Sequence, residues 1–118
     1  MQYMLMFYET PDQIAAREGA NAQAHMAGWM AYIGGLYEAG VGRSGEGLLA
    51  PSTATTVRIR GDKRQVQDGP FADTKEQLGG YMIIEVPHLD NALEWAARAP
   101  CAATGGVEVR PVMPRTAS

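Results

Sequence analysis

The sequence predicts one α+β domain spanning residues 1–118, in the order strand, helix, strands with a hairpin, strand, helix, strand. Three observations predict this fold class. Short apolar runs with strand character occur at residues 3–8, 80–86 and 107–113. Two segments between them carry apolar residues at helical spacing, and a hairpin pattern occupies the middle of the chain. The length of 118 residues suits a single domain.

The first expected strand, residues 3–8, is apolar on both faces. Alternation places Tyr3, Leu5 and Phe7 on one face and Met4, Met6 and Tyr8 on the other. A strand of this kind needs cover on both sides. Thr10 is a suitable N-cap and Pro11 a suitable first helical residue, so a helix is expected to follow.

The first helical segment is expected to run to about Ala39 and to stop at Gly40. A break is expected near Gly19, because the pattern before residue 22 is weak. The apolar stripe consists of Ala22, Met26, Trp29, Ile33 and Leu36. Each glycine inside a helix costs about 1 kcal/mol relative to alanine. Gly28, Gly34 and Gly35 are therefore expected to serve close packing against another backbone.

The rest of the chain supplies the hairpin, two strands and a second helix. After a glycine-rich irregular strand at residues 41–50, residues 53–60 and 64–68 are expected to pair around Gly61-Asp62-Lys63. Alternation places Thr55, Val57 and Ile59 on one hairpin face and Thr56, Arg58 and Arg60 on the other. Residues 80–86 form a central strand. The second helix has an inward stripe and starts at Asp90 or Asn91. That stripe comprises Leu89, Ala92, Leu93 and Ala96.

This order of elements is a ferredoxin-like βαββαβ unit with an inserted β-hairpin. Two helices can cover only one face of its sheet, whereas the first and central strands are apolar on both faces. A second copy of the sheet is the economical cover for the other face. The sequence therefore predicts a homodimer.

The net charge and the residue composition exclude several classes of partner and cofactor. The net charge of −3 argues against nucleic acid, and a single cysteine, Cys101, excludes an internal disulfide framework. Residues 1–8 lack a basic region and are too short for a signal peptide or membrane span, so a cytoplasmic protein without a membrane partner is expected. Two distant histidines and no phosphate-cradling loop predict that neither a metal nor an organic cofactor is needed.

The stretch from Asp68 to Tyr81 is chemically richer than a connection needs, which is typical of functional loops. Gly69 tolerates a positive φ and Pro70 fixes its own backbone, so Asp68 ends a strand with its carboxylate directed at the loop. Asp68 is the leading catalytic candidate, as a general base or ligand anchor; alternatively it caps its own turn. The loop also carries two further catalytic candidates, which either shape the pocket as an ion pair or lie on a solvated face: Lys75 and Glu76.

The stretch from Asp68 to Tyr81 also resembles the signature of a known protein family. Asp68-Gly69-Pro70-Phe71, continued by residues 74–81, resembles the signature of the DGPF branch of the YCII-related proteins. Similarity extends to residues 3–6, 53–58, 90–96 and 107–112, so nearly the whole chain is covered. The resemblance implies a dimeric α+β barrel of ferredoxin-like protomers.

In better understood YCII-like proteins a histidine on the first helix works with a carboxylate. Trp29 takes its place here and His25 lies one turn earlier, which puts a His–Asp pair in doubt. Trp29 and Tyr32 are expected to line a ligand pocket, joined by Tyr81. The remaining ligand-binding candidates are His25, Gly69 and Pro70.

The leading functional interpretation is a cofactor-independent lyase, isomerase or hydrolase. It would act on a small polar or aromatic molecule held between the first helix and the sheet, in part by analogy with relatives. The alternative is a non-catalytic ligand-binding or regulatory module with the same pocket. A second titratable group beside Asp68 would favour catalysis.

Overall fold

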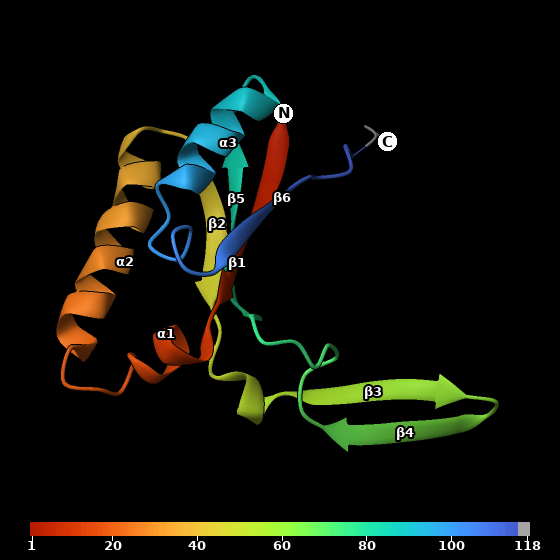
Figure 1. The fold of residues 1–118 in the computed structure, drawn as a ribbon. Helices are drawn as coiled ribbons and strands as arrows, with labels where there is room; N and C mark the ends of the chain where they lie inside the picture. The colour runs from red at the N-terminus through yellow and green to blue at the C-terminus, as the bar shows by residue number, and fades with distance from the viewer. Residues whose placement is uncertain (116–118) are drawn as a thin grey trace.

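The computed structural model describes residues 1–115. Its body is a four-stranded antiparallel sheet, in the order β2–β5–β1–β6, with helices on one face (Figure 1). The strands are β1 (Gln2–Glu9), β2 (Gly42–Gly47), β5 (Gln77–Glu85) and β6 (Gly106–Pro111). The helices are α1 (Pro11–Ala15), α2 (Ala22–Glu38) and α3 (Leu89–Ala97). The predicted ferredoxin-like α+β fold is confirmed.

The inserted hairpin forms a separate two-stranded sheet. Its strands, β3 (Thr55–Arg60) and β4 (Lys63–Asp68), follow a 3-10 helix, η1 (Pro51–Thr53). In Figure 1 the hairpin projects from the body on the side opposite the helices, and we call residues 55–68 the arm. The arm is the reason why the radius of gyration is 16.1 Å, whereas a compact chain of this length has roughly 13.5 Å.

Helix boundaries follow the predicted signals closely. The Thr10 hydroxyl accepts a hydrogen bond from the Gln13 N–H at 3.3 Å, and the Gln13 side chain accepts one from the Thr10 N–H at 3.0 Å. Gly40 follows α2 with φ 79°, the left-handed conformation of a helix stop. The start of α3 is earlier than predicted, because His88 is its N-cap and donates its N–H to the Asn91 side chain at 3.1 Å.

The core lies between the helices and the sheet. Alternate residues of β1 point into it, and Leu5, Leu36 and Ile84 are fully buried. Burying one such side chain contributes about 1.5–3 kcal/mol. The buried apolar cluster comprises Tyr3, Leu5, Phe7, Tyr32, Leu36, Met82, Ile84, Val86, Ala92, Ala96, Ala99 and Cys101. The body therefore obtains its stability on this face.

Of the five residues in the predicted stripe of α2, only Met26 is exposed; Ala22, Trp29, Ile33 and Leu36 are buried or half-buried. Trp29 is partly buried and Leu36 is buried, but Met26 is 56% exposed. His25 is half-buried instead, and Tyr32 is buried. The inward face of α2 therefore includes residues 25, 29, 32, 33 and 36, which keep helical spacing, and Met26 lies outside it.

The helix glycines do not serve the close packing that the sequence suggested. A Cβ atom added at Gly28, Gly34 or Gly35 would meet nothing within 4 Å among the described residues. The expectation that these glycines admit another backbone is therefore wrong within the protomer.

Opposite the helices lies a face that no helix of residues 1–115 covers, which we call the helix-free face. Met4 pairs with Ile83 and Met6 with Tyr81 across β1 and β5, so these half-buried side chains share that face. By the same register the face also carries three acidic side chains: Glu46, Glu85 and Glu108. The prediction that β1 is apolar on both sides is confirmed. Within the described part of the chain, none of the helices is long and apolar enough to cross a membrane.

Candidate functional site

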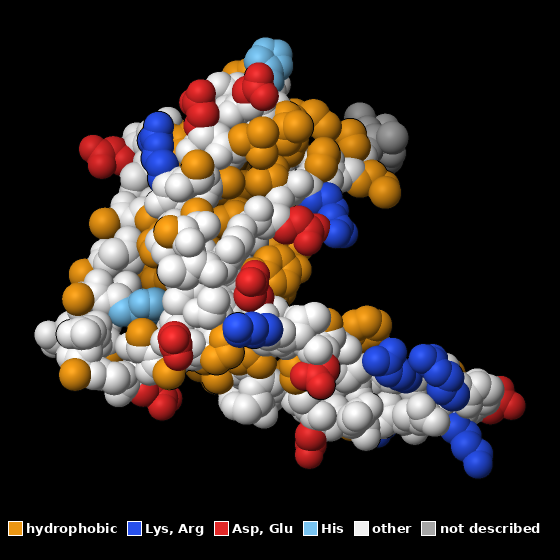
Figure 2. Space-filling model, in the orientation of Figure 1, with side chains coloured by type: hydrophobic (Ala, Val, Ile, Leu, Met, Phe, Trp, Pro, Cys, Tyr) orange, Lys and Arg blue, Asp and Glu red, His pale blue; other side chains and the backbone are white. Residues whose placement is uncertain are grey.

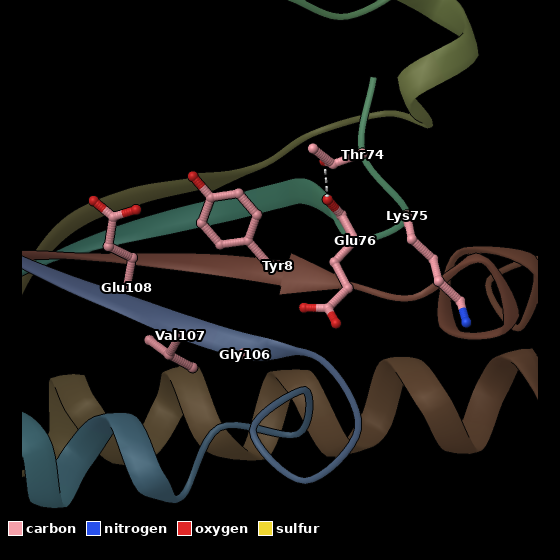
Figure 3. Close-up of a pocket in the computed structure, with 7 residues that line it drawn as sticks. All are labelled: Tyr8, Thr74, Lys75, Glu76, Gly106, Val107 and Glu108. Carbon is pink, nitrogen blue, oxygen red and sulfur yellow. Dashed lines mark hydrogen bonds between the residues drawn. The ribbon is translucent and has the colours of Figure 1, made fainter. Parts of the chain in front are cut away.

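A cleft of about 520 Å³ opens at one end of the helix-free face (Figure 3). Three segments line it: the end of β1, the loop before β5 and the start of β6. The lining residues are Tyr8, Thr74, Lys75, Glu76, Gly106, Val107 and Glu108. Figure 3 shows the Tyr8 ring and the Glu108 carboxylate on the side of the sheet away from the helices.

The loop that carries Lys75 and Glu76 is held by its own side chains. Gln77 Nε2 donates to the carbonyl oxygens of Ala72 at 2.9 Å and of Thr74 at 2.6 Å. Thr74 Oγ1 donates to the carbonyl oxygen of Glu76 at 2.6 Å. Because the backbone is held on both sides of Lys75, the charged side chains start from fixed positions at the cleft.

Tyr8 follows Met4 and Met6 on the helix-free face by the alternation of β1, and its pairing with Gly106 places it beside the start of β6. The pairing of β1 with β5 shifts between Phe7 and Tyr8 and leaves out Gly79. Such a bulge increases the local twist of a sheet. Gly79 has no room for a Cβ atom, which would lie 2.6 Å from Glu9 Oε1.

A buried ion pair lies on the helix side of the same strand end. Glu9 is 3% exposed, and Arg17 Nη2 lies 3.2 Å from its Oε1. Arg17 also donates to the carbonyl oxygens of Leu48 and Gly79, so one guanidinium links four segments of the body. Glu9 Oε2 has no hydrogen-bond partner within residues 1–115. We interpret the pair as the anchor that fixes the strand ends behind the cleft.

Two core groups have strongly raised pKa values. Burial, reinforced by the nearby Glu9 charge, raises the pKa of the Cys101 thiol to about 11. Burial also raises the pKa of Tyr32 well above its ordinary value, with a smaller effect from Cys101. The Tyr32 hydroxyl donates to the Trp95 carbonyl oxygen at 2.8 Å. Both groups are therefore neutral core members at physiological pH.

Asp68 lies at the end of β4, as predicted, but it is exposed on the arm. Asp68 is not among the residues that line the cleft of the protomer, and its role as general base or ligand anchor stays a prediction. Gly69 has the positive φ that the sequence suggested, 107°. The Gly69 N–H donates to the Ala54 carbonyl oxygen at 2.7 Å, and Thr56 Oγ1 donates to the Gly69 carbonyl oxygen at 2.8 Å. Half-buried Pro70 then leads into the loop, and functional roles for this turn stay predictions.

The aromatic residues of α2 fill the space where the pocket was expected. The Trp29 ring packs edge-on against Phe7, with centroids 4.9 Å apart, and Tyr32 packs against both rings. Half-buried His25 lies one turn before Trp29 on the same face of the helix. Tyr81, by contrast, lies on the helix-free face opposite Met6. Ligand contacts for these residues remain predictions.

Sequence reasoning selected Lys75 and Glu76, which line the cleft, and missed Tyr8 and Glu108 as site residues. Outward alternation in β1 and β6 was the available signal, but it does not show that the two strands are neighbours. Across residues 1–115, three or more His, Cys, Asp or Glu side chains do not gather as a metal site requires. The expected independence from metals and cofactors stays a prediction.

Comparison with known proteins identifies the class of protein. Residues 1–116 match the YCII-related domain, so the chain belongs to the YCII-related family. An uncharacterised protein of Rhizobium meliloti (strain 1021) is 46% identical over 67 residues, 54% of this chain. That match spans 54% of the relative, about half of its length.

A solved structure confirms the fold. The chain is similar to the 5-chloro-2-hydroxyhydroquinone dehydrochlorinase TftG of Burkholderia phenoliruptrix AC1100, solved with 2,5-dihydroxybenzoquinone. The TM-score is 0.57, and the alignment covers 96% of this chain and 94% of that one. Identity is 16%, so the likeness shows the fold alone.

Proposed function

We propose that this YCII-related protein binds a compact polar or aromatic molecule in the cleft and converts it without a cofactor. The observation that carries the proposal is the composition of the cleft. Tyr8 offers an aromatic surface, Glu76 and Glu108 offer carboxylates, and Lys75 offers an ammonium group. The volume of about 520 Å³ lies within the roughly 300–1,000 Å³ of small-molecule sites.

These residue types suit proton transfer on a hydroxylated or carbonyl compound. In the proposed reaction Glu76 takes a proton from the substrate as general base, and Lys75 stabilises the negative charge that develops on a substrate oxygen. Glu108 serves as a second acceptor for substrate hydroxyl groups. A lyase, an isomerase or a hydrolase can each begin with such a step.

The structural neighbour suggests the compounds to test first. Its name and its bound molecule both refer to small hydroxylated rings. A ring of that kind fits an aromatic wall and adjacent carboxylates, because the ring stacks while its hydroxyl groups donate. Hydroxylated hydroquinones and benzoquinones are therefore the proposed substrate class.

The alternative is a non-catalytic binding or regulatory module, and the exposure of Glu76 favours it. Catalytic groups act most strongly where water is excluded, whereas the cleft of the protomer is open to solvent. We further propose a cytoplasmic homodimer of the DGPF branch. The half-buried apolar side chains of the helix-free face support the assembly.

Titration with 2,5-dihydroxybenzoquinone tests the proposal. Amide resonances of Tyr8, Glu76 and Glu108 should shift together in ¹⁵N-labelled protein. Glu76→Gln should weaken binding by about tenfold and reduce any turnover at least about 100-fold. Glu94→Gln, an exposed change on α3, is the matched control and should do neither.

The outcomes separate the two functions. Binding with a time-dependent change in the quinone absorbance supports the enzyme, and binding without it supports the module. Unshifted cleft amides at millimolar ligand would contradict this substrate class, and equal effects of the two substitutions would remove Glu76 from the site.

A further inference from the structure

One face of the arm is an exposed apolar surface. Val57, Ile59 and Val66 are 57%, 60% and 54% exposed. Val57 lies directly opposite Val66, and Ile59 lies two residues along the same strand, so the three side chains share one face. By the same register that face also carries Arg64, opposite Ile59, and Asp68 at the base of the arm. We call it the apolar arm face.

The arm has little support from its own chain. A two-stranded hairpin alone is marginally stable in water, and three strands or a packed face are usually needed. Arg58 lies over the Phe71 ring, 4.5 Å from its centroid, on the face opposite Val57. The apolar arm face has no such cover from residues 1–115, and each arm strand has one unpaired edge there. A formed arm is therefore expected to pack on something else.

The charges of the arm and of the rest of the chain indicate what covers the apolar arm face. The arm is basic, with four basic and two acidic side chains: Arg58, Arg60, Lys63, Arg64, Asp62 and Asp68. The remainder of the chain is acidic, with eleven acidic and six basic side chains. The acidic residues include Glu76 and Glu108 at the cleft. The arm of one copy and the body of another thus have net charges of opposite sign, with Arg64 the basic residue on the apolar arm face itself.

Geometry places a second copy within reach. The arm projects on the helix-free side of the sheet (Figure 1), and Figure 2 shows an open hollow between the arm and the upper part of the molecule. A second sheet seated on the helix-free face occupies that hollow and lies beside the arm. In a twofold dimer the arm of each copy lies against the sheet of the other copy in the same way.

We infer that the arm is a clasp that packs its apolar face on a second copy of this chain. The inference rests on the proposed homodimer. Arg64 is the basic residue of the packed face, so it is the residue that meets the acidic residues of the other copy. Asp68 reaches the interface on the same face, which gives the exposed carboxylate a place in the assembly.

Carbodiimide cross-linking tests the contact in the native protein. The chain has only two lysines, Lys63 at the tip of the arm and Lys75 at the cleft. Equal amounts of ¹⁵N-labelled and unlabelled chains are mixed, cross-linked and digested, and mass spectrometry assigns each link. Lys63 should join a carboxylate of the other isotopic form, and Lys63→Arg should remove that link while keeping the charge. Links of Lys63 confined to its own chain, in a sample that is dimeric, would overturn the inference.

Substitutions at two adjacent exposed residues test how much the apolar arm face contributes to the stability of the dimer. Val66→Glu places a charge on the apolar arm face, whereas Gln67→Glu places the same charge on the opposite face. Sedimentation at several dilutions should show the dimer Kd raised at least about tenfold by Val66→Glu and by less than about twofold by Gln67→Glu. Equal effects would overturn the clasp. A monomeric wild-type protein would overturn both clasp and homodimer, while the quinone titration tests cleft function separately.

Discussion

The body and the arm both carry apolar side chains on their strands, but these side chains are covered in different ways. Both contain strands with alternating apolar residues, but β5 buries Met82 and Ile84 under helices of its own chain, whereas β3 leaves Val57 and Ile59 exposed. The helix-side face of the body's sheet is therefore covered from within its own chain, and the apolar arm face is not. Strand periodicity predicts that a face needs cover, but it does not say which chain supplies it.

The largest contrast is expected for single side-chain truncations. Leu36→Ala removes a fully buried side chain from the body, so it should lower the free energy of unfolding by about 2–5 kcal/mol. Val66→Ala in the arm should change it by no more than about 0.5 kcal/mol when the protein is dilute. Urea denaturation of both variants measures the contrast. A comparable cost for the two would show that the arm belongs to the same cooperative core.

Two neighbouring glycines at the start of β6 give a finer test of packing in the body. A Cβ atom at Gly105 would lie 2.1 Å from the Tyr8 carbonyl oxygen, whereas one at Gly106 would meet no described atom within 4 Å. Gly105→Ala should therefore lower the free energy of unfolding by about 1–3 kcal/mol, and Gly106→Ala by less than about 0.5 kcal/mol. Thermal unfolding followed by circular dichroism compares them, and the reverse ranking would refute this packing.

The pH dependence of stability should reveal the buried thiol of the body. Folding raises the pKa of Cys101 from 9.0 to about 11, so the native state favours the protonated thiol. Its contribution is complete below pH 9 and is lost as the pH rises towards 11, because the unfolded chain releases the proton first. Between pH 9 and pH 11 the free energy of unfolding of the wild type should therefore fall relative to that of Cys101→Ala. A constant difference would show that the thiol does not titrate as inferred.

The smallest effect is a stabilisation. Because a Cβ atom at Gly28 would meet nothing among the described residues, Gly28→Ala should raise the free energy of unfolding by about 0.5–1 kcal/mol. Chemical denaturation at a dimeric and at a dilute concentration checks it. A loss of stability only at the higher concentration would show that another copy packs against this part of α2.

The sequence predicted the order of helices and strands because the residues that begin and end these elements act locally. Thr10 and Gly40 act within a few residues of themselves, and both behave as expected. The composition of the loop selected Lys75 and Glu76, which line the cleft, and their catalytic role stays a prediction. Such signals need no knowledge of tertiary packing.

The rest of the site depended on register and packing. Tyr8 and Glu108 lie near one another because β6 pairs with β1 and both residues point to the same face of the sheet. Aromatic residues at helical spacing fit a pocket wall or a core equally well, and Trp29 packs with the core. The position of Asp68 follows from the projection of the arm, which the hairpin pattern does not specify.

Amide hydrogen exchange at two protein concentrations tests the difference between body and arm most directly. The account predicts that β1 and β5 amides exchange slowly at both concentrations. Amides of β3 and β4 should be protected where the dimer forms and should exchange faster by at least about tenfold on dilution to the monomer. Arm amides that exchange at one rate across the dimer–monomer transition would contradict the claim that a second copy holds the arm in place.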